Sequence, residues 1–162
     1  MKKLDIEAAR AVAFHFLGYS ARTRSEIQQR LARDEFPAEI IAQVITELET
    51  DGYLDDTGFA KHWVEDRADR KRYGRVRLAS ELNRKGIDRE TAAGAVDAIE
   101  EDDEVRRAAL AANARWSAED LRTLNPLALQ KEKSRLSGFL MRRGFYWQTI
   151  KKVLDSMLKN NE

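Results

Sequence analysis

The sequence predicts an all-α protein of tandem three-helix repeats, with about nine helices. Three observations support this fold class: an apolar pattern that recurs three times, helix-capping residues at the expected helix starts, and no segment that alternates like a strand. Arrays of this kind present an extended groove more often than an enclosed pocket. We therefore look for function on a surface shared by successive repeats.

The repeat is defined by seven apolar positions. The first copy consists of Ile27, Leu31, Phe36, Ile41, Val44, Ile45 and Leu48. Adding 51 to each number gives Leu78, Leu82, Ile87, Ala92, Ala95, Val96 and Ile99. Adding 109 gives Leu136, Leu140, Phe145, Ile150, Val153, Leu154 and Met157. Gly86 and Gly144 occupy the turn of the second and third copies, where the first copy has Glu35.

Helix signals delimit the first repeat. Apolar residues at helical spacing predict a helix over residues 5–17, with a glycine as its stop. Thr23 and Glu26 form a capping box that starts a short second helix over residues 23–34. A proline in the first turn begins the third helix, over residues 37–50.

The same order of signals continues along the chain. Asp55 and Asp56 offer the N-cap of a helix over residues 55–74. A short helix, the Gly86 turn and a longer helix capped by Asp88 then repeat the first unit. Two further helix starts lie at Ser117 and at residues 125–126, and the last helix reaches about residue 158. The predicted repeats are residues 1–54, 55–103 and 104–162.

The composition excludes several classes of protein. Charged residues make up 35% of the chain, but the net charge is only +1, so nucleic-acid binding requires a local patch. The absence of cysteine excludes disulfides, thiol catalysis and thiolate metal sites. No apolar run approaches the ~18 residues of a membrane span. Because residues 1–5 also lack a signal-peptide core, we expect a cytoplasmic protein with no membrane contact.

Two basic clusters lie at equivalent positions of successive repeats. Residues 67–85 contain only two acids, Asp69 and Glu81, and residues 131–152 contain only Glu132. Such clusters neutralise phosphates in nucleic-acid binding. A solvated helix face with i,i+4 ion pairs is the alternative, and the recurrence favours a shared basic face.

Catalytic and metal chemistry find little support in the sequence. His15 and His62 are the only histidines and lie on different predicted helices, and there is no Gly-rich phosphate loop. Asp55 and Asp56 could ligate magnesium, but helix capping accounts for both. We expect no enzymatic activity, no cofactor and no metal.

Most aromatic residues are expected in the core, because they lie on or near the apolar pattern. They are Phe36, Phe59, Trp63, Phe145 and Trp147. Tyr73 is the exception, since it lies within the first basic cluster, and we single it out as a contact residue.

Residues 51–60 (DGYLDDTGFA), 70–74 (RKRYG) and 81–87 (ELNRKGI) closely resemble the RecX family of recombination regulators. Residues 22–27 (RTRSEI) and 139–145 (FLMRRGF) resemble the family's first and third repeat signatures. The likeness covers nearly the whole chain in the family's order, and segment 108–129 matches least well. Residues 75–77 (RVR) depart from the many relatives that carry a proline after the tyrosine–glycine pair, which should alter a helix start but not the fold.

The resemblance implies an elongated, curved array and a negative regulator of the RecA recombinase, with a role in DNA repair and the SOS response. Proteins of this family lodge in the groove of the RecA–single-stranded DNA filament. They inhibit its ATPase and strand exchange by blocking extension or destabilising the filament, and they are not enzymes and need no cofactor. The implied partners are RecA and the single-stranded DNA within the filament. The polar surface and the lack of a heptad seam favour a monomer.

We assign the filament contact to basic residues on the shared side of the repeats, together with Tyr73. The central contact comprises Arg70, Lys71, Arg72, Tyr73, Arg75, Arg84 and Lys85. Lys131, Lys133, Arg142 and Arg143 extend it at one end, and Arg22 and Arg24 extend it at the other. Which of them meet DNA phosphate and which meet RecA stays open.

Two other functions remain open. A helical DNA-binding module that acts without RecA is one, although the balanced net charge and the lack of a basic recognition helix with Asn or Gln argue against it. An adaptor that touches only protein is the other, and it would leave the basic face unexplained.

Overall fold

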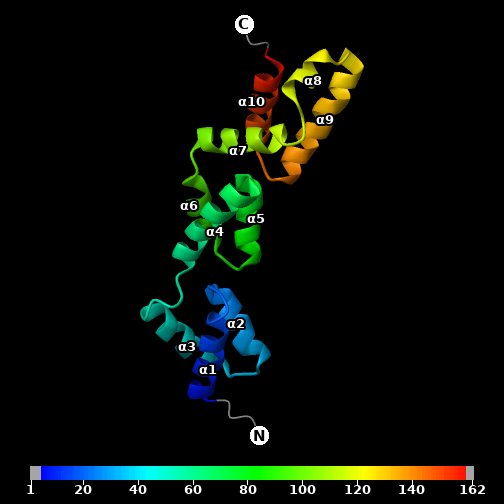
Figure 1. Cartoon of the computed structure of the whole chain (residues 1–162). Helices are drawn as coiled ribbons and strands as arrows, with labels where there is room; N and C mark the ends of the chain where they lie inside the picture. Colours follow the sequence, from blue (N-terminus) through cyan, green and yellow to red (C-terminus); the bar gives the residue numbers. More distant parts are fainter. Residues whose placement is uncertain (1–4, 160–162) are drawn as a thin grey trace. The chain divides into compact units, whose positions relative to one another are not determined.

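A computed structural model describes residues 5–159 of the chain (Figure 1). Residues 1–4 and 160–162 lie outside this range, and with them most of the segment examined for a signal peptide and the ends of the two outer repeat ranges. The described residues form ten α-helices and no strand, which confirms the all-α class. The helices are α1 (Ile6–Leu17), α2 (Arg24–Arg33), α3 (Ala38–Thr50), α4 (Asp56–Lys71), α5 (Arg75–Arg84), α6 (Arg89–Asp97), α7 (Glu101–Asn113), α8 (Ala118–Thr123), α9 (Pro126–Arg142) and α10 (Trp147–Leu158). Among them, no helix has the length and apolar character that crossing a membrane demands.

The expected count of about nine helices is one too few. The stretch between Asp88 and Ser117 holds two helices, α6 and α7, where the sequence predicts a single longer one. Residues 98–100 separate them, and four consecutive acids, Glu101 to Glu104, begin α7. Because negative side chains are favoured at the positive end of the helix dipole, this acidic run marks a helix start.

The chain divides into two compact units, which we describe separately. The first unit comprises the described residues up to His62 together with Leu82–Ala92, and the second comprises Trp63–Glu81 together with the residues from Ala93 onward. Helices α4, α5 and α6 contribute to both units. The units therefore do not follow the three repeat ranges, which stay a prediction.

Each unit has a core made from the recurring apolar positions. Helices α2 and α3 and the turn between them bury all seven positions of the first copy. Helices α9 and α10 and the turn between them bury all seven of the third. Of the second copy, five positions are buried, while Ala95 and Ile99 are half-buried. The apolar pattern thus identified the core of both units.

Small residues on the first helix of each repeat extend the pattern. Ala9 and Ala13 of α1 are fully buried, and so are the residues reached by adding 51 or 99, with at most 4% exposure: Ala60 and Val64 of α4, then Ala108 and Ala112 of α7. Short side chains let a helix pack closely against the two that follow it. At this offset α7 corresponds to α1 and α4, and α8 lies between α7 and α9.

The glycine turn between the second and third helices lies directly against a neighbouring repeat. Gly86 and Gly144 have φ of +78° and +88°, in the left-handed region that favours glycine. A Cβ on Gly86 would lie 2.2 Å from Ser25 Cβ, and one on Gly144 would lie 2.4 Å from the backbone nitrogen of Arg77. Glu35 has the same conformation, with φ of +65°, but its side chain is exposed. Of these three equivalent turns, the two that touch the start of another helix are thus the ones that require glycine.

A carboxylate from the following repeat caps the second helix of each of the first two repeats. Asp56 Oδ1 accepts a hydrogen bond of 2.9 Å from the backbone N–H of Arg24, the first residue of α2. Glu104 Oε1 accepts one of 3.0 Å from the backbone N–H of Arg75, the first residue of α5. N–H groups in the first turn have no partner inside their own helix, so each acid satisfies a group that would otherwise lack one.

Most of the predicted helix caps are confirmed. Thr23 and Glu26 form the capping box of α2. Four other caps accept a backbone hydrogen bond from the residue three positions on: Asp55, Asp88, Ser117 and Asn125. Asp56 differs from the expectation because it is already inside α4 and caps α2 instead.

Replacing Gly144 by alanine should lower the free energy of unfolding by more than about 2 kcal/mol. The left-handed conformation alone costs a non-glycine residue about 1–2 kcal/mol, and the new methyl group would meet the backbone of α5. Glu35→Gly, at the equivalent turn, should change the unfolding free energy by less than about 1 kcal/mol. Urea unfolding followed by circular dichroism measures both, and equal losses would contradict a role for Gly144 in the junction.

Replacing Glu104 by alanine should destabilise the protein by about 3–5 kcal/mol, because it leaves the buried partners of this carboxylate without their counter-charge. Glu104 is 1% exposed, and its Oε2 lies 3.3 Å from Nε of Arg75. Asp56→Ala should cost only about 1 kcal/mol, the usual loss of a helix cap, since the Arg24 side chain is exposed. Thermal unfolding of the two variants measures both losses of stability. A larger loss for Asp56→Ala than for Glu104→Ala would contradict the prediction.

Candidate functional site

Two of the predicted contact residues hold the repeats together. Arg75 Nε lies 3.3 Å from Glu104, and Lys85 Nζ lies 2.7 Å from Glu26. The side chains of Arg75 and Lys85 are only 21% and 31% exposed. Both cations stabilise a junction between helices, and whether they also meet a partner stays a prediction.

The remaining predicted residues of the first unit are dispersed. The Arg22 guanidinium lies 4.0 Å from the centre of the Phe16 ring, and Arg24 forms an ion pair of 3.2 Å with Glu49. Arg84 is exposed. In the second unit, Lys131 is exposed and Lys133 is half-buried. A role for any of them in binding remains a prediction.

The second unit brings residues from the two basic clusters together. Arg70, Lys71, Arg72 and Arg143 line a hollow of about 240 Å³ that is closed by the C-terminal end of α7. Arg72 Nη1 donates a hydrogen bond of 3.2 Å to the carbonyl of Leu110, and Arg143 donates to the carbonyl of Lys71. Helix C-termini carry unpaired carbonyls and partial negative charge, which is why arginines gather there.

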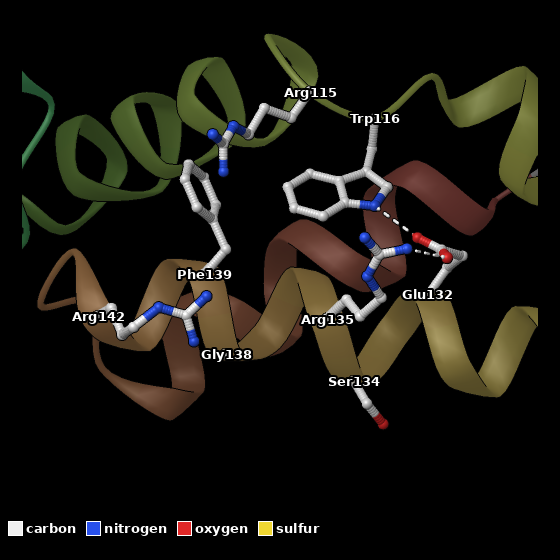
Figure 2. A pocket seen from close by; sticks show the side chains of 8 residues that line it. All are labelled: Arg115, Trp116, Glu132, Ser134, Arg135, Gly138, Phe139 and Arg142. Atoms are coloured by element: carbon white, nitrogen blue, oxygen red, sulfur yellow. Dashed lines mark hydrogen bonds and ion pairs between the residues drawn. The ribbon is translucent and has the colours of Figure 1, made fainter.

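A larger hollow of about 640 Å³ shares Arg115 and Phe139 with the smaller one. Figure 2 shows Arg115 and Trp116, in the loop just past the end of α7, facing side chains of α9. The residues that line the larger hollow are Arg115, Trp116, Glu132, Ser134, Arg135, Gly138, Phe139 and Arg142. Together the two hollows are lined by seven cations and two acids, Asp69 and Glu132. This is a local basic patch of the kind that a net charge of +1 requires for binding a polyanion.

Arginines and aromatic rings alternate across this surface. The Arg115 and Arg143 guanidinium carbons lie 4.8 Å and 5.1 Å from the centre of the Phe139 ring. On the other side, Arg143 lies 5.8 Å and Arg77 3.8 Å from the centre of the Tyr73 ring. A guanidinium stacked on a ring keeps N–H donors at its edge for a phosphate. We call these five residues the arginine–aromatic ladder.

Glu132 is held in place by the residues around the larger hollow. Its Oε2 accepts a hydrogen bond of 3.0 Å from Trp116 Nε1, and its Oε1 accepts one of 2.8 Å from Arg135 Nη1. The hydrogen bond from Trp116, followed by that from Arg135, holds the pKa of Glu132 below its ordinary value. The carboxylate is therefore ionised at neutral pH and fixes the indole ring against α9.

The described residues contain no cluster of His, Asp and Glu that could hold a metal ion. Asp55 and Asp56, the pair considered for magnesium, accept hydrogen bonds from the backbone N–H groups of Gly58 and Arg24. Their side chains act as helix caps.

Three family models match the chain, described as the first, second and third three-helix domains of RecX. They cover residues 9–48, 55–96 and 121–154. The chain belongs to the RecX family. This confirms the resemblance. The first two matches contain α2 and α5 in full and most of α3 and α6, the helices that carry the apolar pattern.

Individual RecX proteins support the same assignment. The "Regulatory protein RecX" of Mycolicibacterium vanbaalenii is 35% identical over 95% of this chain and 84% of its own length. That of Amycolatopsis mediterranei is 33% identical over 85% of this chain and 75% of its own. The crystal structure of RecX from Lactobacillus salivarius has the same fold, with a TM-score of 0.84 at 20% identity over 94% of this chain and 96% of that one.

Some residues of the site were missed by sequence reasoning. Arg115 and Trp116 lie in segment 108–129, where the chain resembles the RecX signatures least, and Phe139 was considered only as part of a signature. An adjacent arginine and tryptophan just past a helix end were the available signal. Trp147, expected in the core, is 59% exposed because it is the first residue of α10.

The fluorescence of Trp116 should report the ionisation of Glu132. Because the folded pKa of Glu132 lies below its ordinary value, the midpoint of the emission change should lie below the pH at which an ordinary glutamate titrates. This carboxylate contributes stability above that pH, and the contribution is lost as the pH falls through the folded pKa. Glu132→Gln should remove this step from the emission titration, and an unchanged step would assign it to another group.

Proposed function

We propose that this chain is a negative regulator of RecA that binds the RecA–single-stranded DNA filament and inhibits its ATPase and strand exchange. Membership of the RecX family supports a regulatory role. The observation that carries the proposal is the arginine–aromatic ladder with its two adjoining hollows, all within the second unit. The chain would act by binding, without catalysis of its own, in the cytoplasm where such filaments form.

The chemistry of this surface suits a single-stranded polyanion. Surfaces that bind single strands combine a groove of cations, which follows the phosphates, with aromatic rings on which bases stack. Here cations on α4 and α9, together with Arg115 just past α7, lie beside Tyr73, Trp116 and Phe139. The same cations would also complement an acidic surface of RecA.

The junction between the second and third repeats supports the proposal by fixing these groups in advance. The backbone N–H of Gly74 donates a hydrogen bond of 2.9 Å to the carbonyl of Arg143, and that of Val76 donates one of 3.0 Å to the carbonyl of Gly144. These bonds hold the α4–α5 connection and the start of α5 beside the turn that follows α9. A preorganised surface loses less conformational entropy on binding.

The proposed contact therefore centres on the second unit. It consists of six residues predicted from the sequence, together with Arg115, which the sequence did not predict. The six are Arg70, Lys71, Arg72, Tyr73, Arg142 and Arg143. Arg75 and Lys85 would act indirectly, through the ion pairs that hold the junctions. Arg22, Arg24, Arg84, Lys131 and Lys133 remain as a proposed extension.

The direct test is ATP turnover by RecA on single-stranded DNA, titrated with this protein. Inhibition at well below one molecule per RecA subunit is expected, since a protein that blocks extension or destabilises a filament acts on many subunits. If the folded protein binds free DNA but leaves RecA turnover unchanged, the DNA-binding module without RecA is the correct function. Its affinity would then fall steeply with salt.

Reversing two exposed charges of the site should weaken inhibition without unfolding the protein. Arg70→Glu with Arg142→Glu should raise the half-inhibitory concentration at least about tenfold, the loss of about 1.4 kcal/mol of binding. Arg70 is 79% exposed, and Arg142 is also exposed. Arg75 is unsuitable for reversal, because a carboxylate there would face the buried Glu104.

The matched control is Lys61→Glu with Arg33→Glu, which makes the same change in net charge. Both residues are exposed and lie in the first unit, and Arg33 occupies the position of the first repeat that corresponds to Arg142. The control should inhibit RecA within about twofold of the unaltered protein, a difference of about 0.4 kcal/mol. Equal weakening in both double variants would show that net charge alone matters.

A further inference from the structure

The larger hollow places ring faces and cations around one space. Trp116 and Phe139 have ring centres 5.4 Å apart and planes tilted by 54°, and Arg142 and Arg115 lie beside Phe139 in the same lining (Figure 2). We propose that this hollow receives one unstacked base of single-stranded DNA, while Arg142 and Arg115 bind the phosphates that flank it. The proposal rests on the proposed function, in which the DNA is the strand held by the filament.

The size and continuity of the space suit this ligand. About 640 Å³ falls within the range of about 300–1,000 Å³ that is usual for small-molecule sites. The smaller hollow shares Arg115 and Phe139 with it, so a strand can pass from one to the other. In that path the base enters the larger hollow and the following phosphates meet Arg70, Lys71 and Arg72.

The indole of Trp116 is fixed before any ligand arrives. Its only N–H already donates to Glu132, which is held in turn by Arg135. The ring therefore offers its face and not a hydrogen-bond donor, and stacking on a ring face is tolerant of base sequence. Sequence-tolerant binding is what a regulator of filaments on arbitrary DNA requires.

Gly138 keeps the hollow open. It lies inside α9, between Arg135 and Arg142, where glycine weakens a helix relative to alanine. The equivalent positions of the first and second repeats hold Gln29 and Ser80. A Cβ on Gly138 would approach only the flexible end of Arg142, at 3.2 Å, so packing does not demand glycine here. Glycine at this position instead leaves the larger hollow unfilled by a side chain.

The test compares binding to oligothymidylate with binding to an abasic oligomer of equal phosphate count, by fluorescence anisotropy. One stacked base should favour oligothymidylate by about fivefold or more. Gly138→Leu should fill the hollow and abolish this preference. The salt dependence of binding should not change, because the phosphate contacts remain.

Gly94→Leu is the matched control. Gly94 lies in α6, and a Cβ there would meet nothing within 4 Å. Both substitutions replace glycine inside a helix, so both variants should melt at or above the temperature of the unaltered protein. The proposal is overturned if the unaltered protein binds the two oligomers equally, which would leave charge alone as the source of affinity. It is also overturned if Gly138→Leu keeps the preference.

RecA turnover separates this proposal from the function on which it rests. Inhibition of RecA without any preference for bases would overturn the base site and leave the proposed function standing. A preference that Gly138→Leu abolishes, in a protein that does not affect RecA, would support the base site and overturn the function.

Discussion

The fold depends on how each repeat docks on the first turn of a helix in the repeat before it. At α2, the backbone N–H of Arg24 is capped by Asp56, and the hydroxyl of Thr23 donates a hydrogen bond of 2.7 Å to the carbonyl of Lys85. At α5, Glu104 caps the backbone N–H of Arg75, and the carbonyl of Arg143 accepts a hydrogen bond from the backbone N–H of Gly74. A helix start has N–H groups without partners, so the next repeat is held where it can supply acceptors. Glycine at the turn then allows the two backbones to come into contact.

The proposed contact surface follows from the second of these junctions. The carbonyl of Arg143 accepts a hydrogen bond from the backbone N–H of Gly74. This places the Arg143 side chain between Tyr73 and Phe139, where it donates to the carbonyl of Lys71. The ladder begins at residues that also make the junction. Its rings and guanidinium groups are therefore positioned by backbone hydrogen bonds, which hold them more firmly than surface ion pairs do. A change in the junction would be felt at the site.

What could be predicted from the sequence was local or periodic. The capping box at Thr23 depends on neighbours within a few residues, and the buried apolar positions follow the helical period; the capping box is present, and all but two of the apolar positions are buried. The two turn glycines were found because they recur, although the contact that requires them is with another repeat. The roles of Arg75 and Lys85 depend on partners 29 and 59 residues away, and a basic residue looks the same in sequence whether it faces solvent or a buried carboxylate. Tyr73 was rightly placed among cations, but only the fold reveals Arg143 as one of them.

The third repeat differs from the others in a way that connects fold and site. Lys133, the equivalent of Arg24 and Arg75, lies inside α9, which begins at Pro126. Its N–H is therefore bonded within the helix and offers no docking point of the kind used at α2 and α5. Leu121, Leu124 and Leu129, from α8 and the first turns of α9, pack against the core of the second unit instead. The loop that leads into α8 carries Arg115 and Trp116. The segment in which the third repeat differs from the first two thus also supplies Arg115 and Trp116, which line the larger hollow.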